Sequence, residues 1–207
     1  MKKYFSRIFI YLLGIIMVSL GIVLCVKCEL GVSPISSVPY VLGYMTPLTF
    51  GTLTMLFHFA NSIFQYVVEK RLINIRVFLQ IPIAFLFGIV IDFFKNLLSF
   101  EPEGIIVKII LMLLSIFLTA LGMHFMLSMQ LVQNPPDGTV NLIAKLTNKS
   151  VGTIKIMYDC GMTVLSIALS NLVLHKTIGF GVATICSAIF VGKVLNIMRA
   201  HIVLDRK

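Results

Sequence analysis

The stretch Thr49-Phe50-Gly51-Thr52 recurs as Ser150-Val151-Gly152-Thr153, 101 residues further along the chain. At the same offset and without a gap, Ser33-Pro34 aligns with Asn134-Pro135. Matching Leu and Ile mean little in so apolar a chain, whereas matching Pro, Gly and Thr at one fixed offset indicate a duplication. The sequence therefore predicts two related halves.

A further match lies nearer the start of each half, where Leu20-Gly21 aligns with Leu121-Gly122. Chance produces one or two such matches, but several at one offset favour a repeat. We place the first repeat at residues 1–104 and the second at residues 105–207, within a single domain.

The composition is that of a membrane protein. Of the 207 residues, 58% are hydrophobic and 12% are charged, and the mean hydropathy is +1.02. Soluble domains carry about 25% charged residues. The net charge of +9 does not indicate nucleic acid, because the basic residues lie between long apolar runs and not on one polar face. We therefore expect a lipid bilayer as partner, and no nucleic acid.

Six segments are apolar enough to be transmembrane helices of about 20 residues. They are residues 8–26, 49–68, 76–98, 108–130, 151–172 and 177–198. Lys and Arg set their orientation, since cytoplasmic loops are enriched in both. With the N- and C-termini cytoplasmic, thirteen of the 17 basic residues lie on the cytoplasmic side. The sequence predicts a multi-pass protein of the bacterial inner (cell) membrane.

Each half contains three predicted spans, an odd number, so the second half enters the membrane from the side opposite to the first. The expected fold class is an all-α membrane protein whose six transmembrane helices form a 3+3 inverted-topology repeat. Inverted repeats recur in secondary transporters, although duplication alone can also build a stable scaffold.

The joint after the first span of each half is longer than a tight turn needs. Ser33 before Pro34, and Asn134 before Pro135, are typical of an N-cap residue followed by proline at the first helical position. We expect a short connecting helix in each half, at residues 34–45 and 135–147. Each either dips into the bilayer, where its N-terminus can bind an anion or polar group, or lies at the interface as an amphipathic connector.

Polar side chains form a stripe along one face of two predicted spans. The stripe consists of Thr54, His58, Asn61 and Gln65 in the second span, and of Lys155, Asp159, Thr163, Ser166 and Ser170 in the fifth. Ionisable groups at membrane depth are candidates for function because they are costly to bury. The repeat aligns His58 with Asp159, each about 13 Å into its span.

Two interpretations of these residues stay open. They either line a path, with Asp159 as a proton or cation site and His58 as its partner, or they join the helices through hydrogen bonds. Asp137 is a further candidate, near the start of the second connecting helix, where negative charge is favoured. The candidate path residues are His58, Asn61, Gln65, Asp137, Asp159 and Thr163.

Signatures of catalysis are missing from the sequence. It has no GxSxG, P-loop or HExxH motif, and no Cys/His cluster with the spacing of metal ligands. We therefore expect no enzyme activity, no catalytic residues, no metal site and no cofactor.

The repeated joints resemble those of the YczE/YyaS/YitT-like family of bacterial integral membrane proteins, and most closely its YczE branch. That family has a Gly-Leu-Gly-x-x-Pro-like stretch, then a short helix and Thr-Gly-x-Ser-x-Gly-Thr, with a Pro-x-Asp-Gly variant in the second half. Here Leu30-Gly31-Val32-Ser33-Pro34 and Asn134-Pro135-Pro136-Asp137-Gly138 correspond. The resemblance covers nearly the whole chain and implies the same architecture, but no substrate. The acidic residue that often follows the first proline is replaced around Ile35-Ser36-Ser37.

The expected function is that of a small secondary transporter or permease for a small polar or charged solute. One repeat would rock against the other around His58, Asp159 and Asp137. The alternative is a non-transporting membrane partner or scaffold that supports a biosynthetic or secretion system. Six spans are few for a complete transport pathway, which leaves room for a homodimer.

Overall fold

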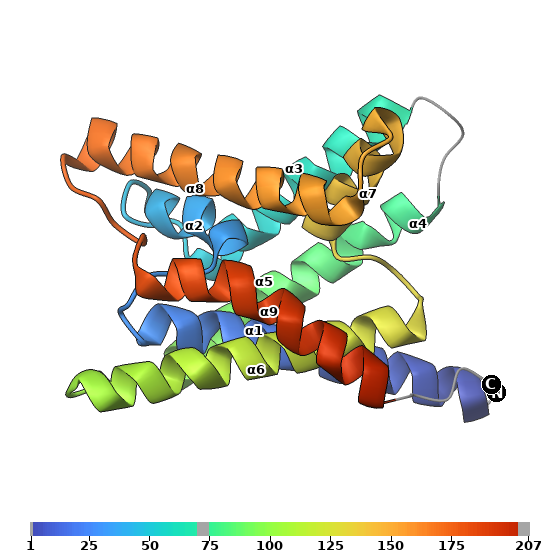
Figure 1. The fold of residues 1–207 in the computed structure, drawn as a ribbon, viewed down its shortest axis with the longest axis horizontal. Helices are drawn as coiled ribbons and strands as arrows, with labels where there is room; N and C mark the ends of the chain where they lie inside the picture. The colour runs from blue at the N-terminus through green and yellow to red at the C-terminus, as the bar shows by residue number, and fades with distance from the viewer. Residues whose placement is uncertain (1, 70–74, 203–207) are drawn as a thin grey trace. The chain divides into compact units, whose positions relative to one another are not determined.

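The fold, as given by a computed structural model, is described for residues 2–69 and 75–202. Within these residues the chain is helical (Figure 1). The helices are α1 (Lys2–Lys27), α2 (Pro34–Leu42), α3 (Phe50–Glu69), α4 (Ile75–Phe78), α5 (Gln80–Leu97), α6 (Ile105–Met129), α7 (Pro135–Thr147), α8 (Val151–Leu174) and α9 (Val182–His201). Four basic residues used to predict the orientation lie outside the described residues: Lys70, Arg71, Arg206 and Lys207.

A long helix occupies each of the six predicted spans. Five of them are long and apolar enough to cross a membrane, namely α1, α5, α6, α8 and α9. The sixth, α3, is 20 residues long, but His58, Asn61 and Gln65 lower its hydropathy. The all-helical fold is therefore confirmed for the described residues, whereas the count of six crossings stays a prediction.

The third predicted span begins later than expected, because α4 and α5 are separate helices. Pro82 lies in the first turn of α5 and has no N–H to donate to the carbonyl of Phe78, four residues earlier. The helix therefore breaks at Leu79, between α4 and α5.

The helices form two compact units, each built from both halves of the sequence. Unit 1 comprises residues 1–33, 90–131 and 179–207, and so contains α1, the end of α5, α6 and α9. Unit 2 comprises residues 34–89 and 132–178, and contains α2, α3, α4, the start of α5, α7 and α8. The compact units thus differ from the two repeats, whose boundary stays a prediction.

In unit 1, α1 and α6 pack side by side and run antiparallel (Figure 1). The Arg7 guanidinium, near the start of α1, donates to the carbonyl oxygen of Met129 at the end of α6 over 2.6 Å. At the other end, Lys108 of α6 forms an ion pair with Glu29, just after α1. These two helices occupy equivalent positions in the predicted repeats.

Glycines bring the backbones of α1 and α6 together at two related points. A Cβ at Gly122 would lie 2.6 Å from the carbonyl oxygen of Gly14, and a Cβ at Gly21 would lie 2.9 Å from that of Ser115. Gly122 is the counterpart of Gly21 at the 101-residue offset, and Ser115 is the counterpart of Gly14. The same contact is therefore made twice, with the two halves exchanging roles.

The starts of α3 and α8 show the same correspondence. The Thr49 hydroxyl accepts a hydrogen bond from the backbone N–H of Thr52 over 3.1 Å, and the Ser150 hydroxyl accepts one from Thr153 over 3.1 Å. Each hydroxyl pairs with one of the free N–H groups of a helix N-terminus. The sequence match that indicates the repeat is thus a pair of matching helix caps.

Both predicted connecting helices are present, in unit 2. α7 spans the expected 135–147, whereas α2 ends at Leu42, three residues early. Asn134 occupies the N-cap position, but its side chain makes no capping hydrogen bond. Pro135 and Pro136 fill the first two helical positions and have no N–H to donate, so these two positions offer the cap no donor. The Asn134 amide instead contacts Asp137, with 3.4 Å between Nδ2 and Oδ2.

We predict that Gly122→Ala lowers the free energy of unfolding by about 1–3 kcal/mol, because the added methyl group forces the two backbones apart. The matched control is Gly161→Ala on α8, where a Cβ meets nothing within 4 Å. That change should leave stability unaltered or raise it by up to about 1 kcal/mol. Thermal unfolding of both variants in detergent tests the difference; equal behaviour would contradict the close crossing.

Candidate functional site

The polar stripe of α3 is buried, as expected for a face that packs inside the protein. Exposed fractions are 2% for Thr54 and His58, 7% for Asn61 and 4% for Gln65. On the same helix Ile63 and Tyr66 are 58% and 63% exposed. The stripe is therefore an inward-facing surface of unit 2, and α7 and α8 supply many of its partners.

Gln65 joins α3 to the start of α7. Its Nε2 lies 2.9 Å from the carbonyl oxygen of Pro135 and 3.3 Å from the Thr139 hydroxyl, and its Oε1 accepts from Gln80 Nε2 over 3.1 Å. Gly138 permits this approach, since a Cβ there would lie 2.6 Å from Gln65 Oε1. The glycine of the Pro136-Asp137-Gly138 joint therefore makes room for an interhelical amide.

Asn61 joins three helices. Its side-chain Oδ1 accepts a hydrogen bond from the Tyr158 hydroxyl of α8 over 2.8 Å. Its backbone carbonyl accepts another from the Thr139 hydroxyl of α7 over 3.3 Å. Hydrogen bonds of this kind hold helices together where water is scarce, at about 1 kcal/mol each. Asn61, Gln65, Gln80, Thr139 and Tyr158 are called the amide network below.

A charged group lies beside the amide network, where α7 meets α8. Lys155 Nζ is 2.8 Å from Asp159 Oδ1, one turn along the same helix, and 4.0 Å from Asp137 Oδ1 in the first turn of α7. The three side chains are 12–30% exposed. We call Asp137, Lys155 and Asp159 the charged triad. Such a group can bind a cation or exchange a proton.

The structure gives Asp159 a different partner from the expected one. Its ion pair is with Lys155, while the His58 ring packs edge-on against Phe87 with 5.2 Å between centroids. His58 Nδ1 is buried without a hydrogen-bond partner. The Thr163 hydroxyl donates to the backbone oxygen of Asp159 over 2.9 Å, and so does not reach the carboxylate. An acid four residues after a lysine pairs with it along the helix, without help from another helix.

Sequence reasoning named His58, Asn61, Gln65, Asp137, Asp159 and Thr163 as candidates. Of these, Asn61 and Gln65 lie in the amide network, and Asp137 and Asp159 lie in the charged triad. It missed Thr139, Tyr158 and Gln80, and it did not select Lys155. The i,i+4 spacing to Asp159 was a signal for Lys155; no sequence pattern indicated that Tyr158 reaches Asn61.

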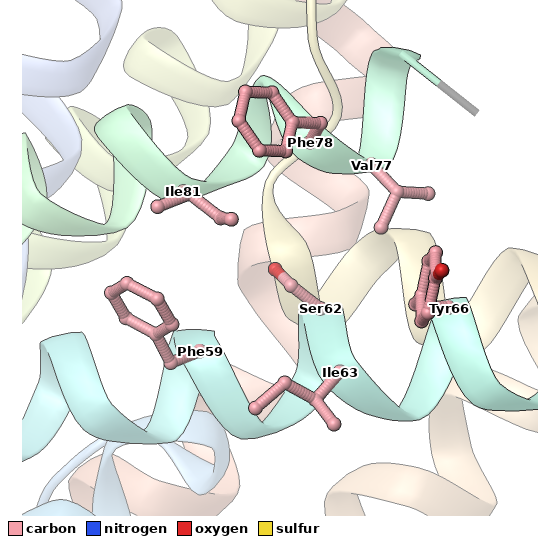
Figure 2. A pocket seen from close by; sticks show the side chains of 7 residues that line it. All are labelled: Phe59, Ser62, Ile63, Tyr66, Val77, Phe78 and Ile81. Atoms are coloured by element: carbon pink, nitrogen blue, oxygen red, sulfur yellow. The ribbon is translucent and has the colours of Figure 1, made fainter. Parts of the chain in front are cut away.

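An apolar groove of about 240 Å³ lies on the other side of α3, between this helix and the α4–α5 segment (Figure 2). Its lining consists of Phe59, Ser62, Ile63, Tyr66, Val77, Phe78 and Ile81. The Ser62 hydroxyl, which lies between the two segments in Figure 2, donates to Gln80 Oε1 over 3.0 Å. The Ser62–Gln80 hydrogen bond thus links the wall of the groove to the amide network, and the rest of the lining is largely apolar.

Residues that could hold a metal ion do not gather in the described part of the chain: no three His, Cys, Asp or Glu side chains are placed to share one. The long apolar helices, together with polar side chains turned inward, define a helical membrane protein. Residues 5–200 match the family of unknown function DUF6198, and the chain belongs to that family. No curated protein and no solved structure matches the chain.

We predict that Gln65→Met lowers the free energy of unfolding by about 1–3 kcal/mol, because Gln80 and Thr139 lose a buried partner while the side-chain volume hardly changes. The matched control is Tyr66→Phe on the exposed face of α3, which should cost no more than a few tenths of a kcal/mol. Thermal unfolding in detergent compares the two. A Gln65 variant as stable as the control would show that the network contributes nothing.

Proposed function

We propose that the protein is a small secondary transporter or permease for a small polar or charged solute. The observation that carries this proposal is the charged triad inside the packing of α7 and α8, next to the amide network of α3. A scaffold gains little from it, since a partly exposed ion pair contributes no more than about 1 kcal/mol to stability. Ionisable groups at membrane depth are instead the usual elements of solute and proton paths.

We further propose that the chain crosses the bacterial inner membrane six times as an inverted repeat, with α3 among the crossings. The antiparallel packing of α1 on α6, and the glycine contacts that the halves make reciprocally, support this topology. The inward polar face of α3 supports its inclusion, because its low hydropathy comes from residues that do not face lipid. The resemblance to YczE/YyaS/YitT-like proteins accords with the same plan.

The transport step is best placed within unit 2. Rocking of one whole repeat against the other would separate α1 from α6 at the glycine crossing, and Asn61 from Tyr158 and Thr139. Opening of the Lys155–Asp159 ion pair would break far fewer interhelical contacts than this rocking. We propose that Lys155 leaves Asp159 when the solute or a proton binds, and returns when it departs.

The alternative function is a non-transporting membrane partner of a biosynthetic or secretion system. It is favoured by one feature: the side chains of the amide network satisfy one another, as in a rigid support. Transport and support differ in what they require of Asp159, which the next experiment uses.

We predict that Asp159→Asn abolishes solute flux without lowering the amount of protein in the membrane. The neutral amide keeps the shape of the side chain but removes the charge that Lys155 balances. Uptake or counterflow in proteoliposomes, with quantitative immunoblotting, measures both quantities. Lys149→Gln, which removes an exposed charge in the joint between α7 and α8, is the matched control and should transport normally. Flux that is equal in both variants would favour the supporting role.

We predict that Leu48→Cys and Lys149→Cys react from opposite sides of the membrane. The two positions are counterparts at the 101-residue offset and both are exposed, so their reactivity reports sidedness. In a background with Cys160→Ser and Cys186→Ser, a membrane-impermeant maleimide should label position 48 in intact cells and position 149 after permeabilisation. Labelling of both from one side would rule out the inverted topology.

A further inference from the structure

Cys25 and Cys28 form a Cys-x-x-Cys pair in unit 1, where α1 ends. The helical hydrogen-bond pattern continues to the second cysteine, whose backbone N–H donates to the carbonyl oxygen of Leu24 over 2.9 Å. Helical residues three positions apart have Cα atoms about 5 Å apart. A disulfide joins Cα atoms that are roughly 4.4–6.8 Å apart, so the backbone already holds the two cysteines at the spacing of a disulfide.

The two side chains converge on one place. Cys25 Sγ lies 3.8 Å from the carbonyl oxygen of Gly31, and Cys28 Sγ lies 3.9 Å from the same atom. Cys28 Sγ also folds back to 3.0 Å from the carbonyl oxygen of Cys25, and the two thiols hydrogen-bond each other. The thiols therefore face each other, which cysteines that serve only as small apolar residues need not do.

Cys28 has the properties of the attacking group in thiol–disulfide exchange. A hydrogen bond from the Cys25 thiol, followed by one from the backbone of Leu30, lowers the pKa of the Cys28 thiol to about 7, although burial acts in the opposite direction. The thiolate is the nucleophile, and a thiol whose pKa is near the ambient pH attacks best. Cys28 also lies just beyond the apolar span, next to Glu29, whose side chain is 52% exposed.

A short loop covers the pair. Residues 29–32, called the cover loop below, turn the chain back at the end of α1, because Glu29 and Gly31 adopt φ values of 57° and 108° in the left-handed region. Cys25 and Cys28 are 3% and 0% exposed, and both thiols contact the Gly31 carbonyl of this loop. A reagent in solution therefore reaches the thiols when the cover loop opens.

Two backbone hydrogen bonds hold the cover loop closed. The Leu30 carbonyl oxygen accepts from the N–H of Ala183 over 2.8 Å, and the N–H of Val32 donates to the Gly179 carbonyl oxygen over 2.9 Å. Each contributes about 1 kcal/mol net. Local opening of the loop therefore costs far less than unfolding of α1.

We infer that Cys25 and Cys28 form a reversible disulfide with a small-molecule disulfide as oxidant, and that the cover loop controls access to the pair. The Cys28 thiolate attacks one sulfur of the oxidant and displaces the other as a thiolate. Cys25 then loses its proton and attacks Cys28 Sγ, which displaces the second thiolate. Two protein thiols are thus oxidised to one disulfide, and the oxidant is reduced by two electrons and takes up the two protons.

This inference is independent of the proposed transport function. In the proposed topology, the cover loop lies on the outer side of the inner membrane, where disulfides persist. The experiments below use purified protein, so their outcome does not depend on that topology.

The first experiment counts thiols in the full chain in detergent. The changes Cys160→Ser and Cys186→Ser leave Cys25 and Cys28 as the cysteines of the chain. After incubation with glutathione disulfide, the protein is acid-quenched, alkylated under denaturing conditions and measured by mass spectrometry. Both thiols should disappear without any added mass of glutathione, and dithiothreitol should restore them. Two thiols that still alkylate, or glutathione retained on both, overturn the inference.

Single variants in the same background identify the attacking thiol. Cys25→Ser leaves Cys28 beside a hydroxyl that can still donate to it, and this variant should retain glutathione as a mixed disulfide. Cys28→Ser is the matched control, and its Cys25 thiol should stay free for alkylation. Equal retention in the two variants overturns the order of attack, and retention in neither overturns the reaction.

Two glycines test the cover loop without changing either thiol. A Cβ at Gly181, just before α9, would meet the Leu30 carbonyl oxygen, so Gly181→Ala should open the loop more often and speed the loss of thiols several-fold. At Gly192, within α9, a Cβ meets nothing within 4 Å, so Gly192→Ala is the matched control and should react at the unmodified rate. Equal rates in the two variants overturn the control of access by the loop.

Discussion

The constraint on which this structure depends is that hydrocarbon offers no hydrogen-bond partner. A polar side chain that enters a bilayer without one loses several kcal/mol, so it has to find its partner within the protein. This explains the division of α3 into an outer face with Ile63 and Phe64 and an inner face with Asn61 and Gln65. The inner residues then determine which helices pack on α3, because their partners lie on α5, α7 and α8.

The same constraint acts on both halves of the duplicated chain, but the two halves differ in the polar residues they carry. Glycine contacts and helix caps recur at the 101-residue offset, so the two halves share the means by which helices begin and cross. The charged triad does not recur. Its counterparts in the first half are Ser36, Thr54 and His58, none of them a carboxylate or an ammonium group. A two-fold framework therefore carries one charged site, placed in the half that kept Asp137.

Local features of the fold could be predicted from the sequence, because their causes are local. Proline at positions 34 and 135 marks the connecting helices, and Thr49 and Ser150 mark the helix starts that follow them. Contacts between segments far apart in the sequence were harder to predict. The match of His58 with Asp159 in the repeat suggested a pair, but alignment gives equivalence and not proximity. Nothing in the spacing of Tyr158 indicates that its hydroxyl meets Asn61, since that depends on how α8 is turned against α3.

Satisfaction of hydrogen bonds separates the two roles that the polar residues can have. In the amide network Gln65 and Tyr158 have partners, and such groups stabilise one arrangement of helices without any ligand. Around the charged triad Asn134 Oδ1 has none, and Asp137 is left with a long contact. A protein that only had to hold its helices together would lose stability by keeping acceptors in this condition. The charged triad, with one lysine between two carboxylates, is therefore the part of unit 2 on which the proposed transport function depends.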